Sequence, residues 1–186
     1  VANGEIGSGL REWQRHGPRW MNAGCHRSMY GYQMRAALEL AVDTPHAAVT
    51  FLPLACTGAT IANGMLGSQR IRECPPDARE TCSGTTPAQI AQLTQLLTQA
   101  QRQQSNRALD LILLTVGAND ILFSGLVANV ILEPGAERSL FNRAGIIATA
   151  EQAARIAEVE LPASFSKLRA ALKPLIGNDL RRVVFT

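Results

Sequence analysis

The stretch Leu109-Asp110-Leu111-Ile112-Leu113-Leu114-Thr115-Val116-Gly117-Ala118-Asn119-Asp120 decides the fold class of this chain. Its first eight residues are mostly apolar and end abruptly at Gly-Ala-Asn-Asp, which is typical of a central parallel strand covered on both faces. In an open α/β sheet, ligands bind beyond the carboxyl ends of such strands. The sequence therefore predicts that Asn119 presents an amide donor to a substrate, as in an enzyme.

The composition is that of a globular protein. The chain has 186 residues, of which 46% are hydrophobic and 18% charged, so it can bury a core as one domain. The net charge is only +3 and the arginines are scattered, so we expect no nucleic-acid partner. The longest apolar stretch, 121–132, is shorter than the ~20 residues of a membrane span, so we expect no transmembrane segment.

Helical and strand patterns alternate along the chain. The apolar spacing predicts strands over 47–55, 109–116 and from 182 onward, and a long irregular insertion over 56–86. Alternation of this kind predicts an α/β fold with a doubly wound parallel sheet. Helices are expected over 27–42, from Thr86 as N-cap with Gln89 as its capping-box partner, over 143–158, and from Pro162 to Gly177.

The four cysteines predict an oxidising compartment. Cys74 and Cys82 flank a polar, proline-bearing loop that a disulfide can close, which leaves Cys25 and Cys56 to pair. The alternative is four free thiols, two of them buried. A zinc site is less well supported, because the sequence has no Cys-x-x-Cys and no closely spaced histidine pair. With disulfides, the protein is expected to be secreted or periplasmic.

Two loops carry the candidate chemistry. One is Gly117–Asp120, and the other is 55–60, which follows the preceding strand. Parallel strands bring such loops to the same edge of a sheet, where a glycine amide and an asparagine carboxamide can stabilise charge on a carbonyl oxygen. The alternative is a turn glycine and a helix-capping asparagine with no chemical role.

The sequence resembles the SGNH (GDSL-type) hydrolases. Gly117-Ala118-Asn119-Asp120 is similar to their G-x-N-D block. Cys25-His26-Arg27-Ser28, with Tyr30 after it, and Ala55-Cys56-Thr57-Gly58-Ala59 resemble blocks of the secreted bacterial lipase and esterase branch. The resemblance spans essentially the whole chain, and it implies a three-layer α/β/α, flavodoxin-like sandwich.

The resemblance also implies roles for individual residues. Gly58 corresponds to the oxyanion-hole glycine that donates its backbone N–H, and Asn119 to the asparagine that donates its side-chain N–H. Asp120 resembles the aspartate that holds the loop. The pairs Cys25–Cys56 and Cys74–Cys82 correspond to two bridges of that branch.

Residues 1–186 lack two blocks of the family. The nucleophilic serine is expected immediately before Val1, and the Asp and His of the triad beyond Thr186, so we expect one domain truncated at both ends. Ser8 is a weak substitute because no strand precedes it. His26 is expected to be structural, and His16 and His46 to lie in solvated surface segments.

The sequence thus predicts a secreted carboxylic-ester hydrolase, a lipase or esterase, that works through a serine acyl-enzyme. The expected partner is a small-molecule or lipid ester, with no cofactor and no metal. Two alternatives stay open, a carbohydrate O-acetylesterase and a non-catalytic pseudo-hydrolase or binding module.

Overall fold

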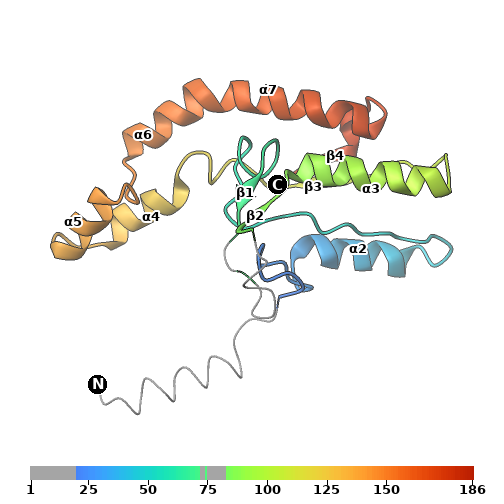
Figure 1. Ribbon diagram of the computed structural model, residues 1–186, viewed down its shortest axis with the longest axis horizontal. Helices are drawn as coiled ribbons and strands as arrows, with labels where there is room; N and C mark the ends of the chain where they lie inside the picture. The colour runs from blue at the N-terminus through green and yellow to red at the C-terminus, as the bar shows by residue number, and fades with distance from the viewer. Residues whose placement is uncertain (1–19, 72–73, 75–82) are drawn as a thin grey trace, which may run out of the picture.

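The computed structural model describes residues 20–71, 74 and 83–186. The fold is mixed α/β and mostly helical, with two two-stranded sheets in the described residues. Helices α6 and α7 form one long curved rod along the top of Figure 1, and α4 and α5 lie at one end of the molecule. The elements are α2 (Tyr32–Asp43), β1 (Gln69–Arg70), β2 (Thr85–Thr86), α3 (Gln89–Gln103), β3 (Ile112–Leu114), α4 (Phe123–Ile131), α5 (Ala136–Arg143), α6 (Ala150–Arg155), a π-helix η1 (Ile156–Glu160), α7 (Leu161–Leu172), the 3-10 helices η2 (Lys173–Ile176) and η3 (Leu180–Arg182), and β4 (Val183–Phe185).

Strands β3 and β4 form the parallel sheet that the sequence predicts at these two places. Ile112 pairs with Val183, and Leu114 with Phe185. The sheet lies between α2 on one side and α7 on the other (Figure 1). The second sheet, β1 and β2, is antiparallel. Within the described ranges the parallel sheet has two strands, so the α/β class is confirmed, whereas an extended parallel sandwich is not present in this part of the chain.

The strand predicted over 47–55 is wrong. These residues have no regular secondary structure and belong to no sheet. Their carbonyls bond instead to a side chain, since the Arg27 guanidinium donates to Ala55 O at 2.9 Å and to Leu54 O at 3.3 Å. β-Branched and aromatic residues favour a strand only when a neighbouring strand supplies ladder partners. Among the described residues, no strand pairs with this segment.

Three predicted helix starts differ from the structure. The helix expected over 143–158 begins at Ala150, because α5 ends at Arg143 and residues 144–149 are not helical. The first helix begins at Tyr32 rather than near Arg27, because residues 21–27 fold into a tight turn in which Met21 N donates to Arg27 O. Thr86 is not an N-cap, because it lies in β2 and pairs with Gln69. Helix α3 begins at Gln89 after Ala88, with no side-chain cap.

The predicted break before Pro162 is also wrong. Thr149 and Gln152 form a capping box that starts α6, and the helix then widens into η1 and continues as α7 through Pro162. Proline lacks the N–H of a regular helix and clashes with the preceding turn. The π-turn immediately before Pro162 accommodates the proline without ending the helix. The predicted end near Gly177 is confirmed, since Gly177 caps η2 with φ 61°.

The hydrophobic core lies where α7 crosses β3. Leu168 and Leu172, one turn apart on α7, are 1% and 3% exposed and pack with Leu114 of β3. Ile61 and Met65, from the loop before β1, complete this cluster. The core therefore joins the long helix, the parallel sheet and the 56–67 loop in one packing unit.

Helix α4 packs closely against the chain before α6. A Cβ placed on Gly125 would lie 2.6 Å from Ile146 O and 2.9 Å from Ala148 Cβ. We expect Gly125→Ala to lower the free energy of unfolding by about 1–3 kcal/mol, because overpacking outweighs the ~1 kcal/mol that alanine gains in helix propensity. Gly135→Ala is the control, since Gly135 has extended backbone and nothing within 4 Å. Urea unfolding measures both, and equal stability of the two variants would contradict the prediction.

Candidate functional site

The two loops singled out from the sequence lie side by side. Asn119 Nδ2 donates to Ala59 O at 2.9 Å, and Ile61 N donates to Asp120 Oδ1 at 2.9 Å. These two hydrogen bonds link segments that are about sixty residues apart in the chain. Asn119 bonds to Ala59, and the next residue, Asp120, bonds to Ile61 two residues further along the other loop. Gly58, Ala59 and Asn119 therefore share one neighbourhood next to the carboxyl end of β3.

Gly58 presents an available backbone donor. Its φ is 80°, in the left-handed region that glycine adopts at little cost. Within the described residues, Gly58 N–H donates to no other group, whereas the neighbouring Thr57 N–H donates to Cys25 O at 3.1 Å and Ala59 N–H to Cys56 O at 3.1 Å. The turn thus uses the amides on both sides of Gly58 and leaves this one available to a ligand.

Asn119 presents a second donor. One N–H of its carboxamide is used by Ala59 O, which sets the side-chain position. The carboxamide has two N–H groups, and the other has no acceptor among the described residues. Asn119 is exposed, so a ligand can reach this group. Asn119 is hydrogen-bonded to the residue that follows Gly58, and a backbone N–H and a side-chain N–H on two such neighbouring segments can form a neutral anion-binding pair.

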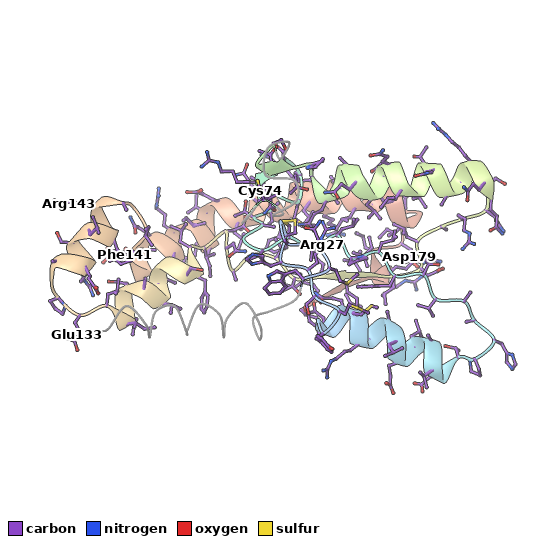
Figure 2. All side chains as sticks on the ribbon, turned by 60° about the horizontal axis from the view of Figure 1, so that its bottom comes forward. Arg27, Cys74, Glu133, Phe141, Arg143 and Asp179 are labelled. Atoms are coloured by element: carbon purple, nitrogen blue, oxygen red, sulfur yellow. A yellow bond between two sulfur atoms is a disulfide. The ribbon has the colours of Figure 1, made fainter. Side chains whose placement is uncertain are left out.

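A disulfide and side-chain hydrogen bonds hold the Gly58 turn in place. The predicted Cys25–Cys56 disulfide is confirmed, and both cysteines are buried. Arg27 lies near the centre of the molecule (Figure 2), where its guanidinium bonds to the carbonyls of Ala55 and Leu54. Burial lowers the pKa of Arg27 from its ordinary value, yet a guanidinium remains charged at neutral pH. Its positive charge next to the turn favours an anion at the site.

Two residues of this neighbourhood were missed by the sequence reasoning. Gln69 is buried, and its Nε2 donates to Thr57 O at 3.2 Å. Tyr32, rather than Tyr30, reaches the sheet, because its hydroxyl bonds to Thr186 Oγ1 at 2.7 Å and to Thr115 Oγ1. Tyr30 is instead 79% exposed. Neither contact has a sequence signal, since a single glutamine or tyrosine has no distinctive spacing.

The other candidate residues do not join the site. His26 has φ 51° and stacks on Trp20, with ring centroids 4.7 Å apart. His46 is exposed in the turn after α2. Ser8 and His16 lie outside the described residues, as does Cys82 and with it the predicted Cys74–Cys82 pairing.

Neither a metal-binding cluster nor a membrane span occurs in the described ranges. No group of three or more His, Cys, Asp or Glu side chains there is placed to hold a metal ion. None of the helices in that part of the chain is long and apolar enough to cross a bilayer.

Asp120 is expected to hold the two loops together. Its Oδ1 accepts from Ile61 N–H, and Ile61 is 1% exposed, so removal of the carboxylate leaves a buried donor without a partner. We expect Asp120→Ala to lower the free energy of unfolding by about 1–3 kcal/mol. Asp120→Asn retains an acceptor oxygen and restores part of that loss. Asp110→Ala, at an exposed carboxylate, is the matched control; a similar loss there would contradict this role.

The Cys25–Cys56 disulfide closes a segment of 31 residues. A loop of this length restricts the unfolded chain enough that the double substitution Cys25→Ser and Cys56→Ser is expected to cost about 3 kcal/mol of stability. Chemical unfolding of the two forms under non-reducing conditions measures the difference. An unchanged midpoint would show that the bridge does not stabilise the native state.

Comparison with protein-family models, with curated proteins and with solved structures finds no match for this chain.

Proposed function

We propose that this chain carries the oxyanion hole of a serine-dependent carboxylic-ester hydrolase of SGNH type. The observation that carries the proposal is the hydrogen bond from Asn119 Nδ2 to Ala59 O, because Ala59 directly follows Gly58, whose N–H has no acceptor among the described residues. Two such donors stabilise the negative charge that develops on the carbonyl oxygen of an ester under attack.

In this proposal a serine Oγ from the segment before Val1 attacks the ester carbonyl carbon, and a histidine from the segment after Thr186 takes the serine proton. The carbonyl oxygen becomes an oxyanion that accepts from Gly58 N–H, Asn119 Nδ2–H and the serine's own N–H. Collapse of the tetrahedral intermediate expels the alcohol and leaves an acyl-serine, which water then hydrolyses to the acid. The parallel pair β3–β4 would be the centre of a three-layer α/β/α sandwich.

A lipid ester is favoured over an acetylated glycan as substrate. Helix α4 starts directly after the Gly117–Asp120 loop, and its Phe123, Val130 and Ile131 are 53%, 86% and 70% exposed. Phe123 lies three residues after Asp120, and an exposed apolar side chain at this position suits an acyl chain, whereas sugar hydroxyls need polar partners. The disulfide Cys25–Cys56 supports a location outside the cytoplasm.

The proposed activity is tested with protein that includes the segments on both sides of residues 1–186. We expect a fluorophosphonate probe to label one serine and the protein to hydrolyse p-nitrophenyl esters. Asn119→Ala is expected to lower kcat by about 100-fold, because one oxyanion donor is lost. Asn142→Ala is the control, since that exposed side chain at the end of α5 bonds to nothing described. Absence of labelling and of ester hydrolysis in this longer protein would contradict the proposed function.

A further inference from the structure

Gln69 is the one polar residue that is buried among the described residues, with 8% of its surface exposed. A polar side chain loses its hydration on burial, so its position must be supported by hydrogen bonds. Gln69 starts β1, and the next residue, Arg70, faces solvent. The carboxamide of Gln69 therefore points into the protein, toward the Gly58 turn, rather than toward solvent.

The hydrogen bonds define which end of the carboxamide faces the turn. Gln69 Nε2 lies 3.2 Å from Thr57 O and 3.4 Å from Arg70 O. Both partners are carbonyl oxygens, which only accept, so the group between them must be the NH₂ and not the oxygen. Gln69 thus holds the carbonyl of the peptide bond between Thr57 and Gly58.

That same peptide unit carries the Gly58 N–H. A trans peptide is planar, and its C=O and N–H point in opposite directions; no cis peptide bond occurs in the described residues. When Gln69 draws Thr57 O toward the interior, Gly58 N–H must point away from the interior. The orientation of the proposed oxyanion donor is therefore coupled to a buried amide on another element.

The space for this amide depends on Gly64. A Cβ at Gly64 would lie 2.1 Å from Gln69 Oε1 and 2.6 Å from Ala59 Cβ, and its φ is 115°. Gln69 Oε1 is buried without a hydrogen-bond partner among the described residues, which costs free energy. The fold therefore retains an unfavourable buried acceptor at this position. The Nε2 of the same carboxamide donates to Thr57 O.

We infer that Gln69 is a positioning residue that aims Gly58 N–H at the bound oxyanion. This inference rests on the proposed function, because it assigns a purpose to the direction of that N–H. Gln69 touches neither substrate nor oxyanion and acts only through the Thr57–Gly58 peptide. It stabilises the transition state by keeping a neutral donor oriented before the substrate arrives.

The test is a titration of the full 186-residue chain with methylphosphonate, a tetrahedral oxyanion, at constant ionic strength. The backbone amide of Gly58 and the side-chain amide of Asn119 are followed by ¹⁵N-resolved NMR. In the unsubstituted chain both signals should shift with one common Kd. In Gln69→Met the Gly58 shift should disappear and Kd should rise about tenfold, the effect of one lost donor to an anion. The Asn119 signal should still respond, which a general loss of structure would not allow.

Gln101→Met is the matched control, because Gln101 Nε2 also donates to a backbone carbonyl, Arg107 O at 2.8 Å, but on the exposed end of α3. It should bind methylphosphonate like the unsubstituted chain. An unchanged Gly58 response in Gln69→Met would overturn the inference. If that variant does not fold, Gln69→Glu serves instead. Protonation of its carboxyl restores a donor to Thr57 O, so the Gly58 amide signal should return toward its original position at low pH, and a pH-independent Gly58 signal would overturn the inference.

The two proposals fail in different ways. If neither amide of the unsubstituted chain responds to methylphosphonate, the anion site and with it the proposed function are contradicted. The effect of Gln69 on the Gly58 peptide can then still be measured without methylphosphonate. Gln69→Met should shift the Gly58 amide resonance, and Gln101→Met should not. If the unsubstituted chain binds and Gln69→Met binds equally well, only the positioning role is wrong.

Discussion

The candidate site depends on two hydrogen bonds between loops that are far apart in the chain. Asn119 donates to Ala59 O, and Asp120 accepts from Ile61 N–H. Two consecutive residues of one loop are thus hydrogen-bonded to two nearby residues of the other. Ile61 is also a member of the buried core. The hydrogen bond to Asp120 and the packing of Ile61 in the core therefore stabilise the same arrangement of the two loops.

The turn around Gly58 is held mainly through its carbonyl groups. Leu54, Ala55, Thr57 and Ala59 each accept a hydrogen bond from a side chain of Arg27, Gln69 or Asn119. A peptide whose carbonyl is engaged has its N–H direction defined as well. An irregular segment with no ladder partners thereby acquires a rigid backbone, which is what a preorganised donor requires.

The long helical rod explains why the sheet and the site stay together. Helix α7 supplies Leu168 and Leu172 to the core, and Phe165 lies edge-on to Phe185 of β4 with ring centroids 5.5 Å apart. Phe165 also lies 3.6 Å from a Cβ position on Gly117, two residues before Asn119. The same helix thus contacts β3, β4 and the start of the Asn119 loop. All three contacting residues follow Pro162 on α7.

The sequence by itself determined the elements whose signal is local. The apolar run before Gly117 predicted β3, the short apolar end predicted β4 and their parallel pairing, and the cysteines predicted the bridge between Cys25 and Cys56. The proximity of the two loops was also predicted and is confirmed, although the strand over 47–55 on which that prediction rested does not form. Hydrophobic runs and turn residues are local features of the sequence, and the small even number of cysteines limits the possible disulfides, which is why these features could be predicted.

Only the tertiary structure decided the rest. The segment 47–55 has strand composition but no neighbouring strand among the described residues, so it is held by Arg27 instead. Pro162 continues a helix because a π-turn lies ahead of it. Gln69 belongs to the site because its Nε2 donates to the carbonyl of Thr57, twelve residues earlier in the chain. Each outcome depends on a partner distant in sequence, and a residue's own identity does not specify which partner the fold will bring to it.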